Sequence, residues 1–162
     1  MPHALDLPLD TLGAWLTPRL PDFDGPLHAT RFKGGQSNPT YLIESANARC
    51  VLRRKPLGPL LASAHAIDRE YRVLRALHGG ALPVPQPLVC CDEDSVIGNA
   101  FYLMEAIDGR VEIDPALPDW SRHDRDAAYT AILAVLTALC ASTSTPRVSR
   151  ITASPAITSP AR

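Results

Sequence analysis

Apolar and polar positions alternate between residues 29 and 56, and turn residues interrupt the alternation twice. The alternation predicts three short strands: one that ends near Phe32, one over Thr40–Glu44 and one over Arg49–Arg54. Gly34 and Gly35 lie in the first turn, and glycine adopts backbone angles that other residues resist. This stretch is therefore expected to form a strand–turn–strand unit.

A helical period replaces the alternation between residues 63 and 77. It predicts a helix with one apolar stripe, which Gly79–Gly80 would end. Glu70 lies on that stripe, where a buried carboxylate requires a cationic partner. A place at the solvated edge of the stripe is the alternative for Glu70. The stripe consists of Ile67, Tyr71, Leu74 and Leu77.

A short amphipathic helix is predicted over residues 10–20. Asp10 would be its N-cap, and Pro18 and Pro21 limit its length. Its apolar face is expected to pack against the sheet, and binding of a partner is the alternative. That face consists of Leu12, Trp15 and Leu16.

Three prolines at alternate positions favour an extended segment over residues 82–87. Two further strands are predicted at 88–91 and 101–104. The acidic residues 92–94 between them are expected to form a solvated hairpin turn rather than a metal site.

A third helix is predicted from Ser121 to about Cys140. Ser121 followed three residues later by Asp124 forms a capping box. Its apolar face is wide and consists of Tyr129, Ile132, Leu133, Leu136 and Leu139.

Composition excludes several classes of function. The 162 residues fit one domain, or slightly less than a two-lobed one. A net charge of -1 gives no electrostatic basis for binding nucleic acid or an anionic membrane surface. No apolar run approaches membrane-spanning length, and the first ten residues lack the features of a secretory signal. We expect a cytoplasmic protein.

The four cysteines have no C-x-x-C or Cys/His spacing typical of a metal site. They are expected to be small, reduced core residues of a cytosolic protein. They are Cys50, Cys90, Cys91 and Cys140.

The candidate functional residues are those of the glycine turn and the cations of the third predicted strand. The N–H groups of such a turn can lie against phosphate oxygens, although an ordinary hairpin turn has the same composition. Arg53 and Lys55 lie two residues apart, so their side chains point to one face of the strand. A cation on this strand is the natural partner for Glu70.

Several motifs in order resemble the N-terminal lobe of the aminoglycoside phosphotransferase family, which has a protein-kinase-like fold. They are F-K-G-G-Q-S-N-P-T-Y-L, V-L-R-R-K-P, S-A-H-A-I-D-R-E-Y-R-V-L-R-A-L, L-P-V-P-Q-P-L and G-N-A-F-Y-L-M-E. The resemblance covers about residues 5–139. It is nearest to the branch that in some organisms occurs beside acyl-CoA dehydrogenases.

This resemblance implies an α+β fold and a division of the chain. An N-terminal helix and lead-in would occupy residues 1–28. A kinase-like lobe over 29–107 would contain an antiparallel sheet of about five strands with one packed helix. The linker and first helix of an incomplete C-terminal lobe would follow over 108–141, and a disordered tail over 142–162.

The resemblance also implies an ATP site. The glycine turn would contact the phosphates, Arg53 would bind phosphate and pair with Glu70, and Val51 would lie against the adenine. Residues 104–106 would form the hinge that hydrogen-bonds the adenine edge. Arg53 stands where many kinases have lysine, and Lys55 is the alternative cation. The implied nucleotide-binding set is Gly34, Gly35, Gln36, Ser37, Asn38, Val51, Arg53, Lys55, Glu70, Met104, Glu105 and Ala106.

Catalytic residues of the family have no match in this sequence. The family takes its base from a His-Gly-Asp loop with a downstream Asn, and its magnesium ligands from that Asn and a later acidic strand. His123–Asp124 lacks the intervening glycine and lies at a helix start. We therefore expect no catalytic residue and no metal ligand here, because phosphoryl transfer depends on such groups. Magnesium and a small-molecule acceptor (an aminoglycoside, a hydroxyacyl-CoA or another alcohol) would belong to an intact relative.

The last residues, 142–162, are rich in Ser, Thr, Pro and Arg and contain no acid, lysine or aromatic residue. This composition predicts disorder, and a phosphorylated regulatory tail is one interpretation. The other is a reading frame lost near Cys140. Back-translation with G/C-rich codons, one base out of register, can spell V-D-F-D-A-A-G-V-A-D-Y-G-K-P-G-N-Y-F-A-R-Q, which resembles the family. Sequencing the coding DNA tests this hypothesis.

Three functional hypotheses follow. The first is a truncated phosphotransferase lobe that binds ATP with little or no catalysis. The second is a non-enzymatic nucleotide-binding or interaction module that recruits a partner through the exposed helix 122–140. The third is a small-molecule kinase completed by a separate chain with the C-terminal lobe.

Overall fold

The computed structural model describes residues 7–32, 38–56, 67–110, 112 and 114–143. The chain forms two compact units, one from residues 1–75 and 85–107 and the other from residues 76–84 and 108–162. The predicted tail from residue 144 onward lies outside the described residues.

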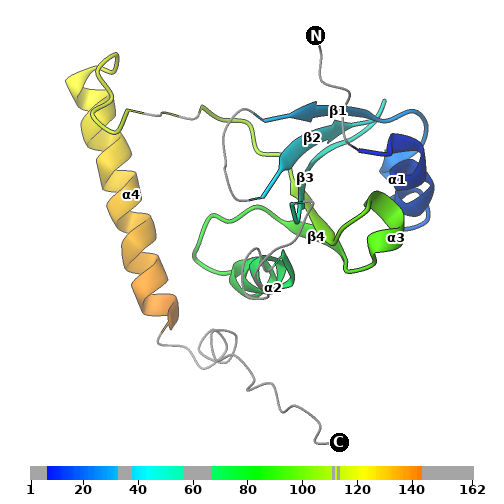
Figure 1. The fold of residues 1–162 in the computed structure, drawn as a ribbon. Helices are drawn as coiled ribbons and strands as arrows, with labels where there is room; N and C mark the ends of the chain where they lie inside the picture. The colour runs from blue at the N-terminus through cyan, green and yellow to red at the C-terminus, as the bar shows by residue number, and fades with distance from the viewer. Residues whose placement is uncertain (1–6, 33–37, 57–66, 111, 113, 144–162) are drawn as a thin grey trace, which may run out of the picture. The chain divides into compact units, whose positions relative to one another are not determined.

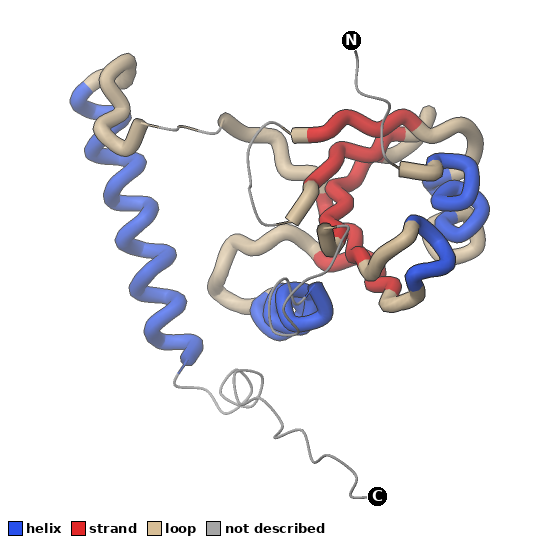
Figure 2. Tube along the Cα trace, in the orientation of Figure 1, coloured by secondary structure: helices blue, strands red, loops and turns tan. Residues whose placement is uncertain are grey.

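Five strands of the first unit form one antiparallel sheet with the spatial order β1-β2-β3-β5-β4 (Figures 1 and 2). The predicted antiparallel sheet of about five strands is thereby confirmed, and the second and third strands have the predicted bounds. The strands are β1 (His28–Arg31), β2 (Thr40–Glu44), β3 (Arg49–Arg54), β4 (Pro87–Cys91) and β5 (Phe101–Glu105).

Alternation along the strands gives the sheet two different faces. On the first face, Tyr41, Ile43, Cys50, Leu52 and Leu103 are all almost completely buried. The residues between them in β2, β3 and β5 point to the second face. We call the first the apolar face and the second the polar face, because the second carries Thr40, Arg53 and Tyr102.

Two helices, α1 (Leu9–Leu16) and α3 (Asp94–Ile97), pack on the apolar face (Figure 1). In α1 (Leu9–Leu16), Leu12 and Leu16 are fully buried, and Trp15 meets the ring of Phe101 edge-on at a centroid distance of 5.2 Å. The predicted packing of this helix is confirmed. The predicted cap is wrong: the N-cap is Pro8, and Asp10 lies in the first turn. A short 3-10 helix, η1 (Pro21–Phe23), follows.

The acidic connection between β4 and β5 contains a helix, α3 (Asp94–Ile97). The predicted antiparallel hairpin and the exposure of the acidic residues 92–94 are confirmed, but the connection contains a helix instead of a simple turn. Val96 and Ile97 are buried in the same core as α1, and their burial gives this short turn of helix its stability. Gly98 ends the helix with a φ of 85°, a left-handed angle at which glycine is favoured.

The polar face of the sheet contacts α2 (Ile67–Leu77), whose Glu70 bonds to strand residues. Residues 63–66 of the predicted helix lie outside the described residues. Its predicted end is confirmed, since Gly79 has a φ of 77° just beyond Leu77.

Arg53 and Arg54 are consecutive but lie on opposite faces of β3. Arg53 points to the polar face. Arg54 is 3% exposed, and its guanidinium carbon lies 5.6 Å from the centre of the Tyr41 ring.

In the second unit, α4 (Arg122–Thr143) extends three residues beyond its predicted end. The Ser121 hydroxyl accepts a hydrogen bond from the Asp124 N–H at 3.1 Å, which confirms the predicted cap. Apolar side chains of α4 are exposed, among them Ile132 and Leu133. We expected no apolar run of membrane-spanning length, but α4 reaches it by length and composition. This is weak evidence, because helices of soluble proteins pass the same test.

The cysteines only partly follow the prediction of a core location. Cys50 and Cys91 are buried, Cys90 is half-buried and Cys140 is exposed. The predicted core location is wrong for Cys140, which belongs to the apolar surface of α4.

Candidate functional site

Strand register builds two parallel rows of side chains on the polar face. The first, which we call the polar row, runs across four strands and consists of Thr40, Arg53, Tyr102 and Cys90. The second, which we call the apolar row, lies beside it and consists of Leu42, Val51, Met104 and Pro87. Directly opposed residues of antiparallel strands lie about 5 Å apart, so each row is continuous.

An ion pair joins the polar row to α2. Arg53 Nε donates to Glu70 Oε2 at 3.0 Å, and Arg53 Nη2 lies 3.4 Å from Glu70 Oε1. The side chains of Arg53 and Glu70 are 28% and 36% exposed. The predicted placement of Glu70 beside a strand cation is therefore found, and Arg53 rather than Lys55 is its partner.

Two further donors fix the Glu70 carboxylate. The Tyr102 hydroxyl donates to Oε2 at 3.1 Å, and Asn38 Nδ2 donates to Oε1 at 2.8 Å. Each carboxylate oxygen therefore accepts two hydrogen bonds, and the four donor groups come from three separate segments. Carboxylates held by several charged and neutral donors keep a fixed orientation.

Burial raises the pKa values of two titratable groups in the polar row. Loss of solvent raises the pKa of the Tyr102 phenol far above its ordinary value, and the Glu70 charge adds to the increase. Tyr102 is therefore a protonated donor at neutral pH. Burial raises the pKa of the Cys90 thiol to about 11, with a further contribution from Asp92. Cys90 is consequently a neutral thiol beside the pair.

Arg53 retains donors after these contacts. Its Nη1 donates to the Thr40 hydroxyl at 3.2 Å, so three of the five guanidinium N–H groups have acceptors. Among the described residues, one N–H on Nη1 and one on Nη2 have no acceptor. Two such groups in one plane match the spacing of two phosphate or carboxylate oxygens.

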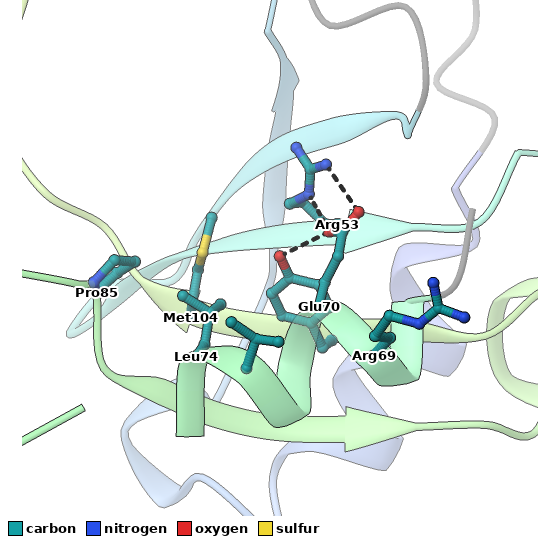
Figure 3. Close-up of a pocket in the computed structure, with 8 residues that line it drawn as sticks. Arg53, Arg69, Glu70, Leu74, Pro85 and Met104 are labelled. Carbon is teal, nitrogen blue, oxygen red and sulfur yellow. Dashed lines mark hydrogen bonds and ion pairs between the residues drawn. The ribbon is translucent and has the colours of Figure 1, made fainter. Parts of the chain in front are cut away.

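A pocket of about 480 Å³ opens between α2 and the sheet (Figure 3). Volumes in this range are typical of sites for small ligands. The pocket is apolar except at the end that holds Arg53, Glu70 and Tyr102, and Arg69 lies at its margin. The remaining lining residues are Val73, Leu74, Pro85 and Met104.

The structure brings together part of the nucleotide-binding set expected from the sequence. Val51 and Met104 are opposed in the apolar row, and Arg53, Glu70 and Asn38 are hydrogen-bonded. The Glu105 N–H donates to the Gln86 carbonyl at 2.8 Å, so this N–H is not available to a ligand. Ala106 follows the end of β5.

Lys55 lies one residue beyond β3, and its backbone N–H donates to the Ala100 carbonyl at 2.9 Å. Its side chain makes no ion pair within the described part of the chain. Gly34, Gly35, Gln36 and Ser37 lie outside the described residues, so their expected contact with phosphate stays a prediction.

Sequence patterns did not identify Tyr102 or Thr40 as members of the site. Both are placed by register: each lies directly opposite Arg53, one on either side. The only available signal was that Tyr102 occupies the position of β5 that alternates with buried Phe101 and Leu103.

The chain is similar to known proteins in sequence and in structure. The family model described as the phosphotransferase enzyme family matches residues 28–155. A crystal structure from Ralstonia eutropha, assigned as an aminoglycoside phosphotransferase, is 40% identical with a TM-score of 0.68. The similarity covers 82% of this chain and 37% of that one.

Curated relatives are acyl-CoA dehydrogenase family members. Member 10 from Mus musculus is 49% identical over 112 residues, which is 69% of this chain and 10% of the relative. Member 11 from Rattus norvegicus is 41% identical over 138 residues, which is 83% of this chain and 18% of the relative. The chain thus matches less than a fifth of either relative.

Proposed function

Because this chain belongs to the phosphotransferase enzyme family, we propose that its first unit binds the phosphate groups of ATP. The resemblance to this family, expected from the motifs, is confirmed by the family model and the solved relative. The five-stranded sheet with its helices matches the kinase-like fold of that relative.

The observation that carries this proposal is the fixed orientation of the Arg53 guanidinium. Tyr102 and Asn38 hold the Arg53–Glu70 ion pair in one orientation, and two N–H groups of Arg53 have no acceptor among the residues that the structure describes. A guanidinium fixed in this way is prepared for an oxyanion, since little side-chain freedom is lost on binding. When bound, ATP would bring a polyphosphate to these N–H groups.

The apolar row supports placement of the base. Val51 and Met104 form a continuous apolar surface beside the polar row, and a planar base packs well on such a surface. The base would lie on the apolar row and the phosphates beside the polar row. The hinge role of Glu105 and Ala106 is part of the proposal.

Magnesium does not fit the residues that the structure describes. No group of three His, Cys, Asp or Glu side chains in this part of the chain is placed to hold a metal ion. We therefore assign no step to the metal. The 162-residue sequence contains no His-Gly-Asp motif, and we propose that these 162 residues bind nucleotide without themselves transferring phosphate.

Isothermal titration of the full chain tests the proposal. ATP, ADP and adenosine would be compared without magnesium, and the Arg53→Met variant would be titrated beside the wild type. We expect ATP to bind more tightly than adenosine, and Arg53→Met to lose about tenfold or more in affinity for ATP, the typical value of a charge-assisted hydrogen bond. Equal binding of all three ligands, or none, would contradict the proposal, and phosphate transfer by this chain would overturn its inactive part.

The exposed apolar side chains of α4 favour a second candidate function, interaction with another protein chain. Contiguous apolar surface of this kind is typical of interfaces. Light scattering of the wild type and of Leu133→Asp would test it. A defined assembly that the variant dissociates supports the interaction, whereas a monomer for both would oppose self-association. We also propose a cytoplasmic location, which agrees with cysteines present as thiols.

A further inference from the structure

A closed ring of hydrogen bonds surrounds the ion pair. Arg53 Nη1 donates to the Thr40 hydroxyl at 3.2 Å, and that hydroxyl donates to the Asn38 carbonyl at 3.1 Å. Asn38 Nδ2 donates in turn to Glu70, which pairs with Arg53 at 3.0 Å. Asn38 is therefore connected to both members of the ion pair, by its side chain to the anion and through Thr40 to the cation.

The position of Asn38 explains why this ring matters. It is the first described residue after the predicted glycine turn, and only 2% of its surface is exposed. One N–H of this buried amide serves Glu70, so the carboxylate holds the amide in place. The resemblance implied that Asn38 contacts nucleotide, and that contact stays a prediction.

We infer that Asn38 is a positioning residue that aligns Arg53 for an oxyanion by closing this ring. This inference rests on the proposed function, because it concerns the orientation of the same cation. Members of a closed network depend on one another, so loss of one bond weakens the others. Without Asn38, Glu70 loses its shortest hydrogen bond and Thr40 loses the acceptor that orients its hydroxyl.

Substitution by aspartate gives a distinctive test. In the Asn38→Asp variant, two carboxyl groups would face each other where one amide hydrogen bond of 2.8 Å now lies. Two carboxylates at this distance repel each other, and neither can donate the N–H that Glu70 now accepts. The ring should therefore open in this variant.

Two measurements on the full chain keep this inference separable from the proposed function. The first is the NMR signal of Arg53 Nε–H without nucleotide, which reports its orientation. The second is ATP affinity by calorimetry. For Asn38→Asp we expect a displaced Nε–H signal and a loss of about tenfold in affinity. Asn38→Ala should show the same losses without the added negative charge.

Tyr71→Phe is a matched control for Tyr102→Phe. Both variants keep an aromatic ring, but only Tyr102 donates to Glu70. Tyr102→Phe should therefore shift the Arg53 Nε–H signal, and Tyr71→Phe should leave it in place. A wild type that binds no ATP, with variants that still shift the signal, would defeat the proposed function and support the positioning role. A signal and affinity in Asn38→Asp that match those of the wild type would overturn the positioning role alone.

Discussion

The two faces of the sheet use the same strands in different ways. On the apolar face, Leu52 and Leu103 are fully buried and touch other apolar groups under α1 and α3. On the polar face, Arg53 of β3 is joined by directed bonds to Glu70 of α2, and these two side chains remain 28% and 36% exposed. The apolar face gains stability from area removed from water, whereas the polar face gains orientation.

This contrast indicates where stability and ligand binding can be separated. A substitution on the apolar face should change the free energy of unfolding and leave the affinity of folded molecules unchanged. A substitution at the polar face should change the affinity, with a smaller loss of unfolding free energy than on the apolar face. The predictions below test this separation, beginning with the largest effect.

Phe101→Ala should cost about 3–5 kcal/mol of unfolding free energy, because the ring is fully buried and leaves a cavity beside Trp15. Urea unfolding measures this change. Phe32→Ala is the control, since Phe32 is 46% exposed, and should cost less than about 0.5 kcal/mol. Similar losses for the two variants would show that the apolar face is not the main source of stability.

Glu70→Ala should reduce ATP affinity about tenfold and unfolding free energy by about 1–3 kcal/mol, since the Asn38 amide and the Tyr102 hydroxyl would lose a shared acceptor. Calorimetry and urea unfolding would be carried out on the same sample. If stability fell as far as in Phe101→Ala while affinity stayed constant, the two faces would not divide the tasks as described.

The adjacent thiols of β4 lie on different faces and should respond differently to pH. The pKa of Cys90 is raised to about 11, so its thiolate fraction, and hence its alkylation rate, should rise about tenfold from pH 8 to pH 9. An ordinary thiol with a pKa near 8.5 would rise only about threefold over this interval. Cys91, which is 4% exposed, should be alkylated more slowly. Mass spectrometry of the alkylated peptide separates the two sites, and a faster reaction at Cys91 would contradict this assignment of faces.

Arg72→Ala should have the smallest effect. Arg72 pairs with Asp68 at 2.8 Å on the exposed surface of α2, with side chains 55% and 66% exposed. Such pairs contribute about 0–0.5 kcal/mol, and ATP affinity should not change. A larger loss in either measurement would mean that this exposed pair contributes more than a surface ion pair usually does.

Sequence patterns could predict elements whose local signal agreed with their tertiary environment. The bounds of β2 and β3 followed from alternation, and Glu70 was expected beside a strand cation because it lies on an apolar stripe. The helix α3 was missed because three acidic residues suggested a solvated turn. The sequence signal that could have revealed it is the apolar pair Val96 and Ile97 followed by Gly98, because helices commonly end at a glycine.

The candidate site was only partly predictable for a different reason. Tyr102 and Thr40 enter it through strand register, which depends on pairing between segments distant in sequence. Asn38 was expected from resemblance to contact the nucleotide, which stays a prediction, but its hydrogen bond to Glu70 was not foreseen. A motif identifies such a residue, and only coordinates identify its partner.

The neighbouring arginines of β3 place a limit on how this lobe can evolve. Arg53 belongs to the site and Arg54 to the interior over Tyr41, so inserting or deleting one residue upstream in the strand would exchange their surroundings. The lineage can therefore vary these positions by substitution but not by changing strand length. Insertions should accumulate in loops, including the one between β2 and β3, while the length of β3 (Arg49–Arg54) stays constant.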